Sequence, residues 1–293
     1  MLSAKITNNG AKALFCLTML VFGTVGIVRV NLPFPSSFIA LARALIACIV
    51  ISIILLIKRE RLDKSVIRTS LPVLCISGVV IGANWITLFE AYRYTSVATA
   101  TLCYYMAPVF VIFLSPIVLH ERLTMKKLIC AGVAVAGMVL VSGVLGGGDV
   151  SFIGLAFALS SAVLYTSVIL MNKRISNVPP LTRTLMQMLS ATITLLPYTL
   201  LTENVADFKF TMASVGLLLV LGAFHTGVAY VIYFGTMRKL TAQSVALFSY
   251  IDPASAVIMS AVVLGESLSF ATIIGAILIL GATIISELNF KKK

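Results

Sequence analysis

The sequence predicts an all-α integral membrane protein in which ten transmembrane helices form two inverted repeats of five, with both termini in the cytoplasm. The composition indicates the class, because 60% of the 293 residues are hydrophobic and only 11% are charged, against roughly 25% charged in an ordinary soluble domain. The lengths of the apolar runs predict the helices. A repeat at a constant offset of 145 positions predicts the two halves.

Ten apolar runs approach the roughly 20 residues that one helix needs to cross a hydrocarbon core about 30 Å thick. Short polar, glycine-rich or proline-containing stretches separate them, where helices end or begin. The runs cover residues 11–30, 37–57, 71–92, 96–119, 125–145, 151–171, 181–201, 211–234, 241–264 and 270–288. Little of the chain remains for a domain outside the membrane.

The basic residues predict the orientation. A net charge of +12 would suggest nucleic-acid binding in a soluble protein, but Lys and Arg cluster between the apolar runs, as the positive-inside rule expects. No nucleic-acid partner is therefore expected. With ten spans and a cytoplasmic N-terminus, only Arg29, Arg43, Arg93 and Lys209 of the 22 basic residues fall elsewhere than on the cytoplasmic side. We expect a multi-pass protein of the inner or plasma cell membrane.

The cysteines and histidines argue against metal sites and against an enzyme. The five cysteines lie in different apolar runs without CxxC spacing, which disfavours structural disulfides and zinc. The two histidines, His120 and His225, are far apart without HExxH spacing, and no second aspartate pairs with Asp252 for catalysis. We expect no metal, no cofactor and no enzymatic activity.

The internal repeat appears when the sequence is shifted by 145 positions without a gap. Leu and Val matches recur by chance in apolar helices, so the charged, aromatic and proline matches carry the argument. These pairs are Arg93 with Arg238, Tyr105 with Tyr250, Pro108 with Pro253 and Glu121 with Glu266. Each half holds an odd number of spans, so the second half must enter the membrane from the opposite side. The predicted repeats cover residues 1–148 and 149–293.

Short motifs in both halves carry a resemblance to a known family. The first half contains AYRYTSVATAT at 91–101, YMAP at 105–108 and HERLT at 120–124, and the second half echoes them with TAQS at 241–244, YIDP at 250–253 and GESLS at 265–269. Over essentially its whole length the chain resembles the EamA type of the drug/metabolite transporter superfamily. The resemblance implies a secondary transporter, commonly an exporter of amino acids or other small metabolites, with a central cavity open alternately to either side.

The resemblance implies no particular substrate, because the superfamily also contains flippases for lipid-linked sugars and exchangers of sugar phosphates or nucleotide sugars. Few charges lie in the spans, which favours a zwitterionic or neutral amphipathic substrate over phosphates. The alternative within transport is a lipid-linked-sugar flippase; from another class, a receptor or scaffold is the alternative. A proton is one candidate coupling ion, and monomer and homodimer both stay open.

Asp252 is the clearest candidate for the substrate path. It lies near the middle of the ninth span, where a charge is costly unless it faces a cavity, and it precedes Pro253, which leaves a backbone carbonyl unpaired. Its repeat mate is the apolar Ala107. The carboxylate could bind a substrate ammonium group or a proton, or could be a structural partner of Arg43 or Tyr250.

Three further polar residues lie within spans. Arg43 could bind a substrate carboxylate, close a gate with Asp252 or extend toward the headgroups. Gln187 could line the path or hydrogen-bond across helices. His225 could titrate during proton coupling or simply pack, and it shares a predicted α-helical face with three small residues. These are Gly222, Thr226 and Ala229.

Aromatic and amide side chains complete the candidates. Asn84 and Trp85, the only tryptophan, lie well inside the third span, where they could line a cavity or pack in a core. The same two possibilities apply to five tyrosines, whose hydroxyls and rings suit a cavity for an amphipathic substrate. These are Tyr104, Tyr105, Tyr165, Tyr230 and Tyr250.

Two pairs of repeat mates have predicted conformational or structural roles. Pro108 and Pro253 lie midway along the fourth and ninth spans, where a kink and freed carbonyls could make paired hinges. Glu121 and Glu266 follow these spans. Each carboxylate is expected to cap the N-terminal amides of the next helix, where negative charge is stabilised.

Overall fold

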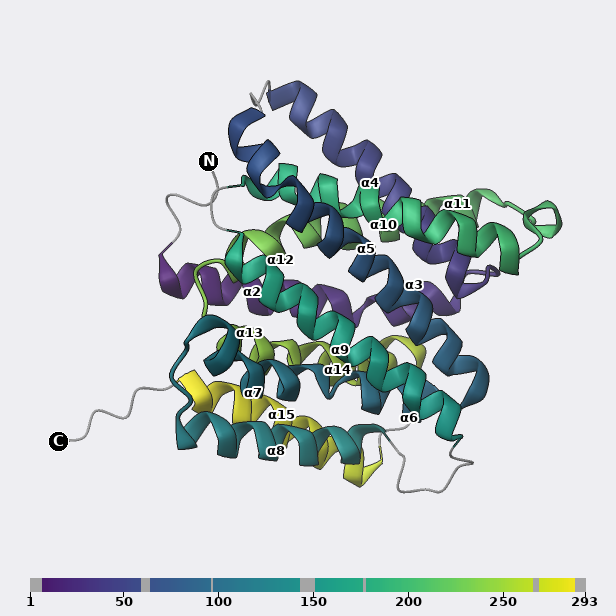
Figure 1. Cartoon of the computed structure of the whole chain (residues 1–293). Coiled ribbons are helices and arrows are strands. Elements are labelled where there is room, and N and C mark those ends of the chain that lie inside the picture. The colour runs from purple at the N-terminus through teal and green to yellow at the C-terminus, as the bar shows by residue number, and fades with distance from the viewer. Residues whose placement is uncertain are drawn as a thin grey trace.

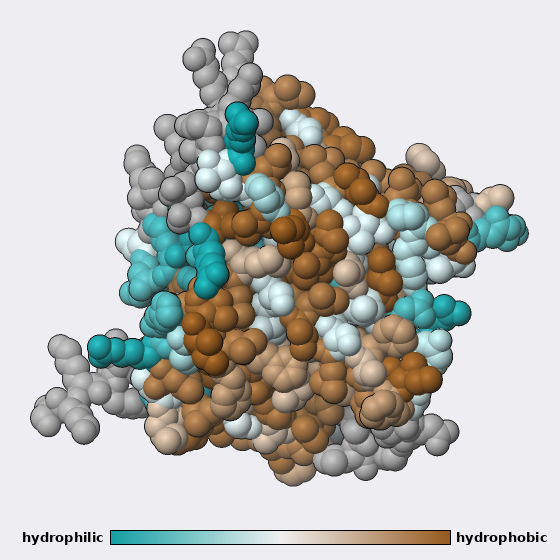
Figure 2. Space-filling view, in the orientation of Figure 1, coloured by the Kyte–Doolittle hydropathy of each residue, from teal (hydrophilic) through white to brown (hydrophobic). Residues whose placement is uncertain are grey.

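The protein is helical throughout the part that the structure describes. This computed structural model covers residues 7–58, 64–95, 97–142, 151–175, 178–265 and 269–287, and all regular secondary structure within these ranges is helical. Eight stretches are long and apolar enough to cross a membrane. Most helices run between the left and the right side of the molecule in Figure 1. Hydrophobic residues cover the middle of the face shown in Figure 2, and hydrophilic residues gather toward its left and right edges.

Within the described ranges, six of the predicted runs are single helices and four are divided into pieces. The single helices are α4 (Ser36–Lys58), α5 (Lys64–Tyr94), α8 (Met125–Ser142), α9 (Phe152–Arg174), α10 (Pro180–Thr202) and α15 (Phe270–Glu287). The divided runs are α2 (Asn8–Gly23) with α3 (Val25–Val30), α6 (Val97–Tyr104) with α7 (Ala107–Leu119), α11 (Met212–Leu219) with η3 (Val220–Val228) and α12 (Ala229–Met237), and α13 (Ala242–Ser249) with α14 (Ile251–Leu264). A short turn, η2 (Val205–Asp207), precedes α11.

Two of the divisions lie at the paired prolines. Pro108 falls at the start of α7 and Pro253 at the start of α14. Proline has no amide hydrogen to donate, so it fits the first turn of a helix and disfavours continuation through it. Each proline therefore lies next to an interruption between two helices, not at a bend within one helix. The hinge role stays a prediction.

A π-helix, η3, lies in the middle of the eighth predicted run. The Thr226 hydroxyl donates to the carbonyl of Leu221, five residues earlier, at 2.8 Å. In this wider turn Thr226 contacts Arg43 on α4, whereas His225 contacts Thr24 at the break between α2 and α3. The α-helical spacing predicted for Gly222, His225, Thr226 and Ala229 is therefore wrong for this segment, because the turns from Val220 to Val228 are π-helical. π-Helical turns occur frequently at functional sites.

Close approach of α5 to α10 depends on a glycine. A Cβ atom at Gly78 would lie 2.4 Å from the carbonyl oxygen of Gln187 and 2.6 Å from Cβ of Ser190. Small residues permit such contacts between membrane helices, where packing replaces the hydrophobic effect as the driving force. The contact joins α5, in the first half of the chain, to α10, in the second half.

Glu121 caps a helix that is distant in sequence. Its Oε1 accepts a 2.7 Å hydrogen bond from the amide of Ala242, and its Oε2 accepts one of 3.3 Å from the amide of Gln243. These amides begin α13, so the expectation that Glu121 caps the next helix, α8, is wrong as to the helix. The loop after α7 folds back on α13, a contact that spacing along the chain does not reveal. Glu266, the other predicted cap, lies outside the described residues.

We expect Glu121→Gln to lower the free energy of unfolding by about 1 kcal/mol, because a neutral amide interacts less favourably with a helix N-terminus than a carboxylate does. Thermal unfolding of the detergent-solubilised protein, followed by tryptophan fluorescence, measures the change. Asp207→Asn is the control, since Asp207 is exposed and its carboxylate accepts a local bond from Asn204. An unchanged midpoint for Glu121→Gln would contradict the capping role.

Candidate functional site

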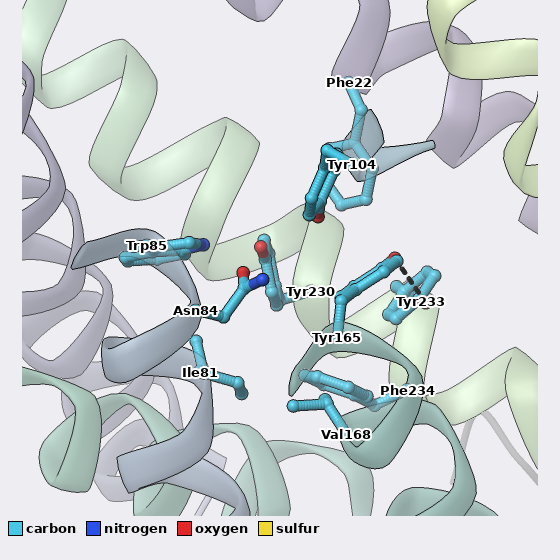
Figure 3. A pocket seen from close by; sticks show the side chains of 10 residues that line it. All are labelled: Phe22, Ile81, Asn84, Trp85, Tyr104, Tyr165, Val168, Tyr230, Tyr233 and Phe234. Carbon is cyan, nitrogen blue, oxygen red and sulfur yellow. Dashed lines mark hydrogen bonds between the residues drawn. The ribbon is translucent and has the colours of Figure 1, made fainter. Parts of the chain in front are cut away.

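An aromatic pocket lies between helices from the two halves of the chain. Helices α2, α5 and α6 supply one part of its wall, and α9 and α12 supply the other (Figure 3). The lining residues are Phe22, Ile81, Asn84, Trp85, Tyr104, Tyr165, Val168, Tyr230, Tyr233 and Phe234. Of the residues that the sequence offers for a cavity, the structure therefore brings five together around one space: Asn84, Trp85, Tyr104, Tyr165 and Tyr230.

Helix α12 supplies an aromatic face to this pocket. Tyr230, Tyr233 and Phe234 follow the helical spacing that places side chains on one side. The Tyr230 and Phe234 rings lie edge to face with centroids 5.6 Å apart, and Phe22 of α2 packs on Tyr230 at 5.3 Å. Such ring pairs contribute about 0.5–1.5 kcal/mol beyond burial. The wall is therefore a packed aromatic surface built before any ligand arrives.

Some polar groups of the pocket are already paired. The amide nitrogen of Asn84 donates to the carbonyl and hydroxyl of Ser161 at 2.7 and 2.8 Å, which ties α5 to α9. The hydroxyls of Tyr165 and Tyr233 are hydrogen-bonded to each other at 2.8 Å (Figure 3). These bonds fix the side chains from which the pocket is built.

Other polar groups are available to a ligand. Within the described ranges, the hydroxyls of Tyr104 and Tyr230 and the indole N–H of Trp85 have no hydrogen-bond partner. Figure 3 shows the indole nitrogen of Trp85 at the pocket side of its ring. The pocket thus combines apolar walls with a few unpaired donors, the usual composition of a small-molecule site.

Arg43 packs against Trp85, one of the residues that line the pocket. Its Nε donates a 3.0 Å hydrogen bond to the Thr226 hydroxyl, and its guanidinium carbon lies 5.4 Å from the centre of the Trp85 ring. The side chain therefore turns inward and makes a cation–π contact. In the part of the chain that the structure describes, Arg43 has no acidic partner, so the predicted gate with Asp252 is not formed in this structure.

Asp252 binds a tyrosine that differs from its predicted partner. Its Oδ2 accepts a 3.1 Å hydrogen bond from the hydroxyl of Tyr105, while the Tyr250 hydroxyl donates to the main-chain carbonyl of Tyr105. Among the described residues no basic side chain forms a salt bridge with Asp252. A carboxylate within a membrane span and without a counter-ion is a functional-site candidate.

The two remaining predicted polar residues lie away from this pocket. His225 is buried, with Nε2 2.8 Å from the Thr24 hydroxyl. Gln187 donates to the hydroxyl of Ser77 at 2.6 Å and to Oδ1 of Asn172 at 3.1 Å, across three helices. Both sets of contacts are typical of residues that fasten helices together.

Sequence reasoning missed three aromatic residues of the wall. Tyr233 and Phe234 follow Tyr230 by three and four positions. This spacing places all three rings on one face of a helix, so Tyr233 and Phe234 could have been predicted from Tyr230. Phe22 offers no such signal, because its place in the pocket depends on how α2 packs against α12. An aromatic residue in an apolar helix is not distinctive by itself.

The apolar helices and the hydrophobic middle of the surface define a multi-pass membrane protein, and an aromatic pocket lies among its helices. The model of the EamA-like transporter family matches residues 11–143 and 152–287. The chain belongs to this family, as the motif resemblance predicted.

Named relatives and one solved structure are similar along most of the chain. The uncharacterised transporters YxxF and YvbV of Bacillus subtilis (strain 168) are each 26% identical, over 85% and 88% of this chain and 80% and 84% of their own lengths. An uncharacterised transporter of Clostridium kluyveri is 26% identical over 69% of this chain and 67% of its own length. A crystal structure 19% identical in sequence matches with a TM-score of 0.85 over 96% of this chain and 99% of that chain, which shows a shared fold.

Proposed function

We propose that the protein is a secondary transporter that exports amino acids or related small metabolites by alternating access through the aromatic pocket. The observation that carries the proposal is the guanidinium of Arg43 stacked on Trp85 beside the unpaired donors of the pocket. Without an acidic partner among the described residues, this cation can bind a substrate carboxylate.

The chemistry of the pocket supports a small amphipathic substrate. Aromatic side chains supply most of its lining, and the few polar groups among them are hydroxyls, an amide and an indole N–H. Tyr230 of the pocket lies near both Arg43 and Asp252. Aromatic walls between a cation and an anion suit a zwitterion that carries an apolar side chain. The direction, export, follows the resemblance of the motifs to the EamA type.

We infer that residues 1–148 and 149–293 are inverted repeats of five transmembrane helices each. The family model matches the chain twice. Helix contacts support the inference, because they persist when the halves are exchanged: α2 packs on α14 as α9 packs on α7, and α4 packs on η3 as α10 packs on α5. The equivalent helices α8 and α15 lie side by side (Figure 1).

An even number of crossings and cytoplasmic termini belong to the same proposal. Helix α2 begins and α15 ends on the same side of the molecule, at the left of Figure 1. The basic clusters support a cytoplasmic position for this side in the inner or plasma membrane of the cell. Pro108 and Pro253, beside the two helix interruptions, are the proposed hinges.

Ligand-induced thermal stabilisation of the purified protein tests the proposed substrate class. We expect free phenylalanine or another amino acid to raise the unfolding midpoint, and phenylalaninamide, which lacks the carboxylate, to have little effect. Arg43→Gln should abolish the difference, because the partner of the carboxylate is then gone. Stabilisation by lipid-linked sugars and by no amino acid would favour the flippase alternative and contradict the proposal.

A further inference from the structure

Two equivalent tyrosines of the proposed repeats touch each other. Tyr105 and Tyr250 are separated by 145 positions, the offset of the repeat, and the Tyr250 hydroxyl donates a 3.1 Å hydrogen bond to the carbonyl of Tyr105. Equivalent residues of two symmetry-related halves can touch only where the symmetry axis passes between them. The axis of the proposed repeat therefore runs past this pair, beside the two helix interruptions.

The hydrogen bonds around this axis are not symmetric. The Tyr105 hydroxyl donates to Oδ2 of Asp252 at 3.1 Å. The residue equivalent to Asp252 in the first half is Ala107, whose side chain has no acceptor, and the Tyr250 hydroxyl bonds to a main-chain carbonyl instead. One hydroxyl of the pair therefore has a carboxylate partner, and its mate has none.

Alternating access would exchange these contacts. In a transporter built from inverted repeats, one access state converts to the other when each half takes up the arrangement that the other half had. Tyr105 would then donate to the carbonyl of Tyr250, and the Tyr250 hydroxyl would face Ala107. Asp252 would lose its hydroxyl donor. An ionised carboxylate without a partner is strongly disfavoured within a membrane, whereas its protonated form is not.

We propose that Asp252 is the proton-coupling group of the carrier. When ionised, it holds the access state seen here through Tyr105, and the protein changes access only after Asp252 has taken up a proton. The inference rests on the alternating-access transporter proposed above and assigns its coupling ion. The asymmetry between Asp252 and Ala107 makes one state sensitive to protonation.

The surroundings of Asp252 favour a proton over a fixed counter-ion. Within the described ranges, the other titratable groups near it are tyrosine hydroxyls from three helices and one turn. These belong to Tyr104, Tyr105, Tyr165 and Tyr230. Helix α2 presents Gly23, which has no side chain, to the main-chain carbonyl of Asp252. Arg43 is engaged with Thr226 and Trp85.

The single tryptophan provides a label-free test. Trp85 is the only tryptophan of the chain and lines the aromatic pocket, so its emission and its quenching by acrylamide report on access to the pocket. Purified protein in lipid nanodiscs, without substrate, would be titrated from alkaline to acidic pH. We expect a one-proton transition with a severalfold change in acrylamide quenching.

Variants assign the transition. Asp252→Asn should abolish the pH-dependent transition, so that acrylamide quenching matches that of the acidic form at every pH. Asp207→Asn is the exposed control with the same change in charge, and it should titrate as the wild type does. Tyr105→Phe should move the midpoint about one pH unit higher, since the ionised carboxylate loses a hydrogen bond. A purely structural role of Tyr105 would change stability and leave the midpoint in place.

Three results would overturn the inference: no transition in the wild type, a transition that persists in Asp252→Asn, or one that disappears in His225→Gln instead. If Asp252→Asn does not fold, the Tyr105→Phe variant still tests the inference, because an unchanged midpoint in that variant would contradict it. The titration contains no substrate, so its outcome is independent of whether amino acids are the cargo. A failure of amino-acid transport with an intact Asp252 titration would overturn the substrate class and leave the coupling group.

Discussion

Gly78→Ala is expected to destabilise the protein by about 1–3 kcal/mol, the usual range for overpacking a close contact. The added methyl group would lie 2.4 Å from the Gln187 carbonyl oxygen and 2.6 Å from Cβ of Ser190. Neither atom is the end of a flexible side chain, so α5 and α10 must move apart. Thermal unfolding in detergent, followed by fluorescence-detected size exclusion, measures the loss.

Gly132→Ala is the matched control for this prediction. A Cβ at Gly132, on the exposed face of α8, meets nothing within 4 Å. Both changes raise helix propensity by about 1 kcal/mol, so their difference isolates the packing between α5 and α10. Equal midpoints for the two variants would show that these helices do not approach as closely as the structure places them.

Trp85→Ala is expected to weaken substrate binding at least about tenfold, since a loss of about 1.4 kcal/mol corresponds to that factor. The change removes a wall of the aromatic pocket, an unpaired indole donor and the ring that faces Arg43 at 5.4 Å. The cation–π contact alone contributes about 0.5–2 kcal/mol. Equilibrium binding of radiolabelled phenylalanine to purified protein measures the change.

Phe113→Ala is the control for the loss of an aromatic residue. Phe113 lies on α7 with 53% of its surface exposed, on the apolar exterior and not among the residues that line the pocket. We expect its affinity to match that of the wild type. If both variants bind equally well, the substrate does not occupy the aromatic pocket.

Fold prediction from the sequence succeeded where the signal is local. The length and hydrophobicity of each run, and prolines such as Pro108 and Pro253, act within a few residues, so the helical segments and two of their interruptions could be predicted. The π-helix could not, because its widened turn depends on how residues such as Thr226 pack against α4. The repeat pointed to Tyr105 and Tyr250 as partners in symmetry, and their contact required the tertiary structure.

The candidate site was predictable only in part for the same physical reason. Asn84, Trp85 and Tyr230 are conspicuous because polar and aromatic groups are uncommon within apolar spans. The partners of charged residues are set by packing between distant segments: Arg43 binds Thr226, 183 positions away, and Asp252 binds Tyr105, 147 positions away. Glu121 caps α13 instead of α8, the helix that follows it in the sequence. Residue type indicated which groups are candidates, and the fold determined which groups meet.

Counterflow in proteoliposomes tests the central claim most directly. Vesicles loaded with an unlabelled amino acid would be diluted into the same labelled amino acid, across a panel in which aromatic amino acids are prominent. The account predicts transient accumulation of label by the wild type, strongly reduced in Trp85→Ala at equal insertion and absent from protein-free liposomes. No accumulation for any amino acid, or equal accumulation in Trp85→Ala, would contradict an amino-acid transporter that works through this pocket.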